Sequence, residues 1–139
     1  MISTVLVPMD DSEMAVRALR YALTVHPEAN ITVVHVAGEP SSMMGRAAGI
    51  ALADDPEAAA DELAADLFER VQTIAAEHET TVDTLTKIGH PARVVINMSE
   101  GFDTVVIGSH GGSLADRLLV GNVAEQIVRR SAAPVTVVR

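Results

Sequence analysis

The sequence predicts an α/β domain whose five-stranded parallel sheet carries helices on both faces. Short apolar runs rich in β-branched residues recur along the chain, and such runs are typical of strands buried on both faces. Segments with apolar residues at helical spacing separate these runs. Strands that alternate with helices in this way lie parallel in one sheet. The chain has the length of a single domain, so we expect one domain over residues 1–139.

Proline and capping residues predict the limits of the elements. The first strand ends at Pro8, and Ser12 is the preferred N-cap of a first helix that stops at Pro27. The expected strands are residues 2–7, 31–36, 81–88, 104–107 and 135–139. A second helix is expected to begin at Pro56 and reach about His78. A third follows the turn at residues 89–91, and a last one begins at Asn122. Residues 37–53 and 109–120 are predicted to be loops.

The composition excludes several classes of protein. A net charge of −9 repels phosphate backbones, and the few basic residues are scattered, so no nucleic-acid partner is expected. No apolar stretch reaches about 18 residues, so we expect no transmembrane helix and no membrane partner. Cysteine is absent, which excludes disulfides and thiolate metal sites. The N-terminus lacks the basic region of a signal peptide, so we expect a cytoplasmic protein. The acidic balance fits either a salt-adapted cytoplasm or simple solubility.

A glycine-rich segment between the fourth strand and the last helix is the most informative part of the sequence. Gly108, Gly111 and Gly121 would let the backbone approach a ligand without a Cβ in the way. The first N–H groups of the following helix can hold a phosphate, with Asn122 as the N-cap and Glu125 completing a capping box. Open α/β sheets bind ligands at the carboxyl ends of their strands, where this segment lies. For each glycine alone, a turn that merely requires glycine is the alternative.

The segment resembles the G-x2-G-x9-G-[ST] signature of nucleotide-binding universal stress proteins. Gly108, Gly111 and Gly121 match its spacing, and Asn122 stands where the signature has Ser or Thr. The resemblance covers nearly the whole chain. The family's first strand and turn are similar to residues 5–13, and the end of its second strand is similar to residues 35–36. The end of its fourth strand is similar to residues 106–111, and its closing segment to residues 131–138.

The resemblance implies a Rossmann-like domain of the adenine-nucleotide alpha-hydrolase type, with strand order 3-2-1-4-5 and an adenine-nucleotide site. The implied ligand is ATP or AMP, with Mg²⁺ arriving together with ATP. Backbone groups of Met9 and Val36 would read the adenine, and Asp10 would bind the ribose or lie near the base, with a cap or salt bridge as its alternative role. The implied nucleotide-binding residues are Pro8, Met9, Asp10, Val36, Gly108, Gly111, Gly121, Asn122 and Val123.

The same resemblance implies a stress-response or regulatory module. The sequence shows no evident general base for hydrolysis, so we expect no dedicated enzyme, with slow ATP turnover left open. Nucleotide binding would change the two predicted loops, and an unknown protein partner would sense that change. The alternative is a dimeric interaction module of the same fold that binds no nucleotide.

The histidines and arginines add few predictions. His35 lies in a buried strand and is expected to be a hydrogen-bonded core residue, whereas His90 and His110 lie at the carboxyl ends of strands and can approach a ligand. The five histidines are too dispersed to predict a metal site. Arg93 and Arg117 are either cations for the phosphates or solvated helix charges.

Other classes of α/β protein lack a required residue. Asp10 and Asp11 resemble the acidic pair of a phosphorelay receiver domain, but the third strand leads into Gly89 and His90 instead of a phosphoacceptor Asp, and no Lys follows the fifth strand. The G-x-G-x-x-G of dinucleotide dehydrogenases is missing after the first strand. The G-x4-G-K-[ST] loop and the G-x-S-x-G elbow are absent as well.

The last strand predicts a homodimer. Residues 135–138 form an apolar run at a sheet edge in the implied strand order, and an exposed edge invites pairing with another chain. A two-fold antiparallel pairing closes such an assembly, and the resemblance implies the same arrangement. We therefore expect a homodimer through residues 135–139; a monomer whose edge is shielded by a loop is the alternative.

Overall fold

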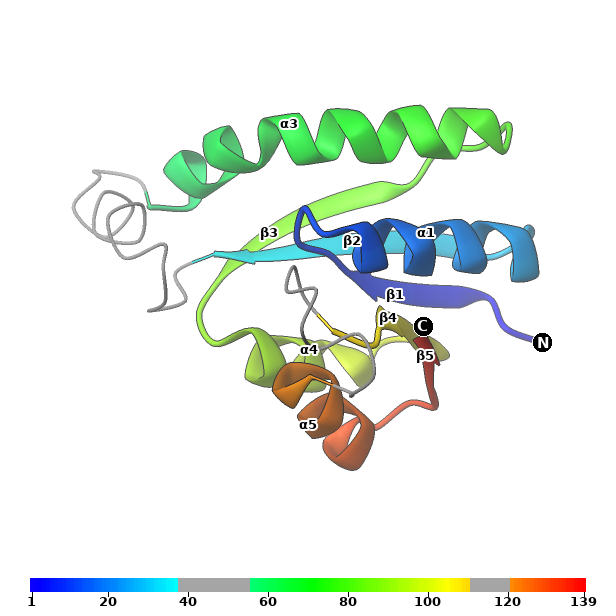
Figure 1. Ribbon diagram of the computed structural model, residues 1–139, viewed down its shortest axis with the longest axis vertical. Coiled ribbons are helices and arrows are strands. Elements are labelled where there is room, and N and C mark those ends of the chain that lie inside the picture. Colours follow the sequence, from blue (N-terminus) through cyan, green and yellow to red (C-terminus); the bar gives the residue numbers. More distant parts are fainter. Residues whose placement is uncertain (38–55, 111–120) are drawn as a thin grey trace.

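The computed structural model of the chain describes residues 1–37, 56–110 and 121–139 (Figure 1). The strands are β1 (Thr4–Pro8), β2 (Asn30–Ala37), β3 (Asp83–Ile88), β4 (Thr104–Gly108) and β5 (Val135–Val138). The helices are α1 (Glu13–Val25), α3 (Pro56–Glu77), α4 (Pro91–Ser99) and α5 (Asn122–Arg130). The predicted fold class is confirmed, because the sheet has five parallel strands in the order β3-β2-β1-β4-β5. The first and third strands begin two residues later than predicted, at Thr4 and Asp83.

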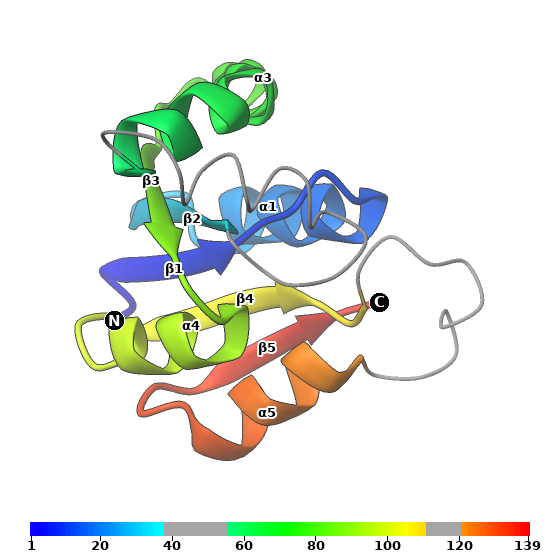
Figure 2. The same cartoon turned by 90° about the vertical axis from the view of Figure 1, so that its left-hand side faces the viewer.

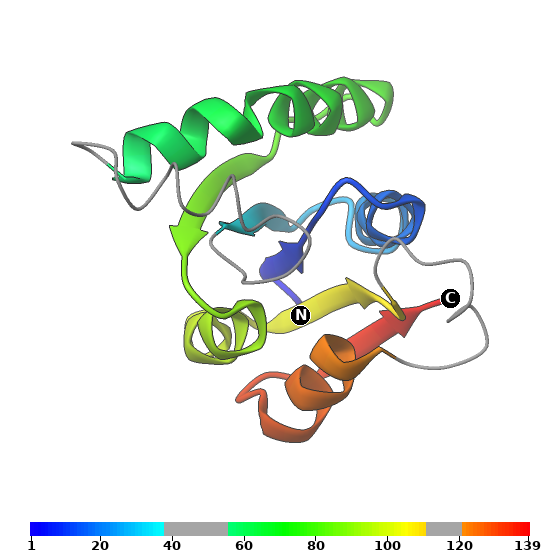
Figure 3. The same cartoon turned by 60° about the vertical axis from the view of Figure 1, so that its left-hand side comes forward.

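Helices cover both faces of the sheet, as predicted. α1 and α3 lie over one face, and α4 and α5 lie over the other, which Figures 2 and 3 show from two further directions. The core under α1 and α3 contains Val5, Val7 and Val33, whereas the core under α4 and α5 contains Leu6 and Val34. Successive residues of β1 and β2 thus serve opposite cores. Both strands are therefore continuous apolar runs rather than alternating ones.

Local signals place the helix starts where the sequence predicts them. Ser12 caps α1, and its Oγ accepts the N–H of Ala15 at 3.2 Å. Pro91 occupies the first turn of α4, where its missing N–H would have had no helical partner. The turn before α4 contains Gly89 at a φ of 145°, a backbone conformation that residues with a side chain rarely adopt.

Two exposed carboxylates tie neighbouring elements together. Asp103 Oδ2 accepts the N–H of Ser3 at 2.8 Å and the N–H of Thr4 at 3.1 Å, and these bonds lower the pKa of Asp103 below its ordinary value of 3.8. Glu77 on α3 pairs with Arg20 on α1 at 2.6 Å, and the hydrogen bond from Arg20 lowers the pKa of Glu77 below 4.5. The first contact fixes the start of β1 against the turn before β4, and the second joins two helices.

The predicted loops lie mostly outside the described residues, and so do Gly111 and Arg117. Within the described part of the chain, none of the helices combines the length and apolar character that crossing a membrane requires. Over the same residues, no three His, Asp or Glu side chains come close enough together to hold a metal ion.

Candidate functional site

A cavity of about 170 Å³ opens at the carboxyl ends of β1, β2 and β4. It lies where the strand order turns from β1 toward β2 on one side and toward β4 on the other, the point at which parallel α/β sheets bind ligands. The structure brings six predicted site residues into its lining, namely Pro8, Met9, Asp10, Val36, Gly108 and Val123. The described lining also contains Ser12, Ala15, Val34, His35, Pro91, Val95, Ile107, His110 and Ile127.

The turn after β1 is built around the side chain of Asp10. Asp10 Oδ1 accepts the N–H of Ser12 at 2.9 Å, and Ser12 in turn caps α1. Asp10 therefore holds the turn that leads into α1, whereas the cap of the helix, one alternative role expected for Asp10, is Ser12. It also lines the cavity, and a carboxylate has a second oxygen that can accept a hydrogen bond from a ligand.

Both backbone groups of Met9 already have partners. The N–H of Met9 donates to the carbonyl of Val34 at 2.8 Å, which extends the pairing of β1 with β2 by one bond. The carbonyl oxygen of Met9 lies 2.9 Å from Nδ1 of His35. A carbonyl only accepts, so Nδ1 of His35 carries the hydrogen in this contact. Of the Met9 backbone, only the second lone pair of the carbonyl remains available to a ligand.

Val36 presents an N–H and a C=O side by side. Along a strand of a parallel sheet, the backbone N–H and C=O of successive residues point alternately to the strand on one side and to the strand on the other. In β2, the carbonyl of Val34 accepts from Met9 on the β1 side, and the carbonyl of Ala37 accepts from Gly89 on the β3 side. Val36 therefore faces the β1 side, but β1 has ended at Pro8, which is paired with Val34. Among the described residues, neither backbone group of Val36 has a backbone partner. The N–H and C=O of Val36 are thus available for the expected hydrogen bonds to a base.

The two described glycines of the signature serve different purposes. A Cβ at Gly108 would lie 2.9 Å from the carbonyl carbon and oxygen of Met14, so the packing of α1 on β4 requires glycine there. A Cβ at Gly121 would lie 3.4 Å from Cα of His110 and 3.5 Å from the carbonyl oxygen of Ser109, which are ordinary contacts. The fold tolerates a side-chain carbon at Gly121 but not at Gly108. Gly108 lines the cavity, yet the close approach it allows is to a helix of the protein itself.

The start of α5 differs from the predicted capping box. The N-cap is Gly121, whose backbone N–H donates to the carbonyl of Ser109 at 2.6 Å, and Asn122 is the first helical residue without a side-chain capping bond. The prediction of Asn122 as N-cap is wrong because Gly121 occupies that position, with the extended backbone of a cap residue at φ −67° and ψ 161°. The first bond of the helix runs from Glu125 to Gly121. The N–H groups of residues 122–124 precede that bond and are the ones that a helix leaves for capping groups or anions.

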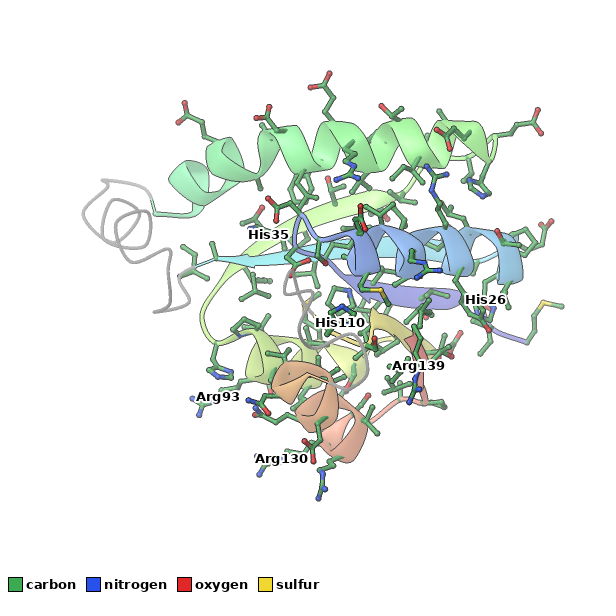
Figure 4. All side chains as sticks on the ribbon, in the orientation of Figure 1. His26, His35, Arg93, His110, Arg130 and Arg139 are labelled. Atoms are coloured by element: carbon green, nitrogen blue, oxygen red, sulfur yellow. The ribbon has the colours of Figure 1, made fainter. Side chains whose placement is uncertain are left out.

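Two imidazoles lie at the cavity and come from opposite sides of β1 (Figure 4). His35 is hydrogen-bonded, as predicted, but it is only partly buried and lines the cavity instead of lying in the core. His110 Nδ1 and Ser109 Oγ are hydrogen-bonded at 3.0 Å, which orients the imidazole at the end of β4. Figure 4 shows His26 at the far end of α1, away from both. His90, the N-cap of α4, and Arg93 are not among the lining residues.

Sequence reasoning missed the part of the lining that comes from helix packing. Val95 of α4 and Ile127 of α5 are buried at helical spacing, which predicts a core face without saying which part of the sheet that face covers. Pro91 was expected only as part of the turn into α4, of which it is the first residue. For His35 a signal did exist, because it is a polar residue next to the end of a strand whose carboxyl end was expected to face the ligand.

A parallel sheet between two helix layers, with a cavity at the switch point of its strand order, defines the Rossmann-like class of α/β domains. Within that class, the chain belongs to the universal stress protein family, which it matches over residues 1–139. The universal stress protein YxiE of Bacillus subtilis is 28% identical over an alignment of 150 positions that covers 100% of both chains.

Solved structures show the same fold. A universal stress protein in complex with cAMP superposes with a TM-score of 0.71 at 24% identity, covering 99% of this chain and 97% of that chain. A universal stress protein family member from Arabidopsis thaliana with AMP bound gives a TM-score of 0.63 at 17% identity, covering 98% of this chain and 90% of that chain.

Proposed function

We propose that this protein binds an adenine nucleotide, ATP or AMP, in the cavity at the carboxyl ends of β1, β2 and β4, and that it acts as a cytoplasmic stress-response or regulatory module. The observation that carries the proposal is that the N–H and C=O of Val36, at the wall of that cavity, have no backbone partner among the described residues, while Val123 of α5 lines the same cavity. One end of the cavity suits a base, and the other suits a phosphate.

The base end depends on complementary hydrogen bonding. Adenine presents an acceptor, N1, beside a donor, its N6 amino group, and Val36 presents an N–H beside a C=O. An N–H to N1 and an N6–H to the carbonyl would complete both groups. Asp10, whose Oδ1 already holds the turn, has an oxygen left for a ribose hydroxyl.

The phosphate end depends on the N-terminus of α5. Its first N–H groups and its dipole favour an anion, and Val123 at the second helical position lines the cavity. His110 lines the same region and is oriented by Ser109, so it can donate a hydrogen bond to a phosphate oxygen. We propose that Gly111, Gly121 and Asn122 complete this end and that Mg²⁺ accompanies ATP as a counter-ion of its phosphates.

Support for the class of ligand comes from the relatives. One solved universal stress protein holds cAMP and another holds AMP, both of which combine adenine with a phosphate. The present chain has the same fold, and its cavity lies at the switch point of the sheet. A binding role, rather than catalysis, is proposed because Ser109, the hydroxyl paired with an imidazole, is buried and is not among the described lining residues.

Isothermal titration with ATP–Mg²⁺ and with AMP tests the proposal. We expect micromolar binding, about −7 to −9 kcal/mol. Mass spectrometry of the nucleotide released from protein purified without added ligand should identify the native one. The absence of both heat and a thermal shift at millimolar nucleotide would contradict the proposal.

A second candidate function is a dimeric interaction module that binds no nucleotide. The half-exposed edge strand β5 favours it, because this edge can pair with a second chain whether or not the cavity is filled. Dimerisation without any nucleotide binding would select this candidate over the first.

A further inference from the structure

The pairing of β1 with β2 ends at an unusual place. Its last bond runs from the N–H of Met9 to the carbonyl of Val34. In a regular parallel ladder, the next bond would run from the N–H of Val36 to the carbonyl of Met9. That carbonyl is instead hydrogen-bonded to the side chain of His35 at 2.9 Å. An imidazole N–H thus stands where a backbone N–H would otherwise have donated.

The geometry points to His35 as a positioning residue: by holding the carbonyl of Met9, it ends the ladder and keeps the N–H and C=O of Val36 free to read a base. The inference deepens the proposed function, on which its role in nucleotide recognition rests. His35 and Met9 both line the cavity, so the contact forms part of its wall. The imidazole itself need not touch the nucleotide.

Losing the imidazole should have a specific structural consequence. A buried carbonyl without a partner is costly, and the nearest backbone donor in register is the N–H of Val36. Without His35, Met9 and Val36 should therefore pair, and β1 should extend by one bond. The N–H of Val36 would then be hydrogen-bonded within the sheet and could no longer donate to adenine N1, while α1 and both cores would stay in place.

The test compares His35→Leu, which removes the donor, with His35→Asn, whose side-chain amide can reach the position of Nδ1. His78→Leu is the matched control, because Nδ1 of His78 also bonds a carbonyl, that of Ile74 at 3.1 Å, and His78 is not among the described lining residues. We expect His35→Leu to weaken AMP binding about tenfold and to reduce the preference for AMP over IMP, in which the donor and acceptor are exchanged. His35→Asn and His78→Leu should stay within about threefold of the wild type.

A measurement without nucleotide separates this inference from the proposed function. NMR scalar couplings across hydrogen bonds should connect His35 Nδ1 with the Met9 carbonyl carbon in the wild type, and Val36 N with the same carbon in His35→Leu. Hydrogen exchange of the Val36 amide should slow in that variant. A Val36 amide that stays unpaired in His35→Leu, or an unchanged AMP-to-IMP preference, would overturn the inference. A wild type that binds no adenine nucleotide would instead overturn the proposed function, and the NMR result alone would then decide whether His35 ends the ladder.

Discussion

Gly108 at the end of β4 lies against Met14 in the first turn of α1 so closely that a Cβ on Gly108 would be 2.9 Å from the Met14 carbonyl carbon and oxygen. The obstructing atoms are backbone, so they cannot move aside as the end of a flexible side chain could. Gly108→Ala must displace α1 or bend β4, and we expect it to lower the free energy of unfolding by about 1–3 kcal/mol. Urea unfolding followed by circular dichroism measures the loss.

Gly121→Ala is the matched control for this substitution. Its Cβ would lie 3.4 Å from the nearest atom, the Cα of His110, which is an ordinary contact distance. We expect unfolding within about 0.5 kcal/mol of the wild type. Equal effects of the two alanines on stability would show that the packing of α1 does not explain the glycine at position 108.

Gly121→Val should abolish nucleotide binding while leaving the fold intact. A branched side chain at the N-cap of α5 points toward His110, which lines the cavity beside the proposed phosphate position. Titration with ATP–Mg²⁺ should show no measurable binding, with the far-ultraviolet circular dichroism unchanged. If Gly121→Val bound ATP like the wild type, α5 would not be the phosphate end of the site.

Asn122→Ala should have little effect on stability. The sequence pattern suggested an N-cap, whose loss typically costs about 1 kcal/mol, but Asn122 is the first helical residue and makes no side-chain capping bond. We expect a change in unfolding free energy within about 0.5 kcal/mol, with ATP binding modestly weaker. Asn122→Ser should keep or strengthen ATP binding by supplying the hydroxyl of the family signature. A loss of 1 kcal/mol or more in Asn122→Ala would restore the capping role.

The sequence predicted the sheet and its helices well, because continuous apolar runs and helix caps are local signals. Ser12 is an N-cap through its own hydroxyl, and nothing distant decides that. The roles of Gly108 and Asn122 were harder to predict, because they depend on what packs against β4 and on which residue becomes the N-cap of α5. The bond from His35 to Met9 depends on strand register, which the amino-acid pattern does not specify to a single residue.

Acid should destabilise the protein partly through Asp103. The pKa of Asp103 is lowered in the folded state, so its stabilising contribution is complete well above pH 3.8 and is lost as the pH falls through the lower native value. Urea midpoints from pH 7 to pH 2 should therefore decline less steeply at the acid end in Asp103→Asn than in the wild type. The two profiles should converge at the lowest pH, where Asp103 of the wild type is protonated and as neutral as the amide that replaces it in the variant.

The salt dependence of stability should distinguish Asp103 from Glu77. The pKa of Glu77 is also lowered, but mainly by its hydrogen bond with Arg20. About 0.5 M NaCl should screen the exposed ion pair and reduce the effect of Glu77→Gln, whereas the N–H groups of Ser3 and Thr4 should keep most of the Asp103 effect. If the urea midpoints of Asp103→Asn and the wild type depended on pH in the same way, Asp103 would not contribute to the loss of stability in acid.

The edge of β5 should carry the homodimer. All four residues of β5 are half-buried, and the strand lies at the end of the sheet. The carbonyls of Pro134 and Val138 bond toward β4, so Thr136 between them also faces β4, while the N–H and C=O of Val135 and Val137 point outward from the sheet. Those outward groups can pair with a second copy across a two-fold axis, and light scattering should give twice the chain mass of 14.6 kDa.

This alternation supplies the variant and its control. Val137→Pro removes an outward N–H and should shift the mass toward the monomer without breaking a bond to β4, whereas Thr136→Pro removes an inward N–H and should lower the stability of the fold itself. Proline is tolerated on an edge strand only where its missing N–H faces away from the sheet, so the two variants should differ in kind and not only in degree. A wild type that stays monomeric at high concentration, in low and in molar salt, would exclude dimerisation through this strand. A dimer that persists unchanged in Val137→Pro would show that the Val137 N–H does not hold the interface, and it would contradict a pairing centred on this part of β5.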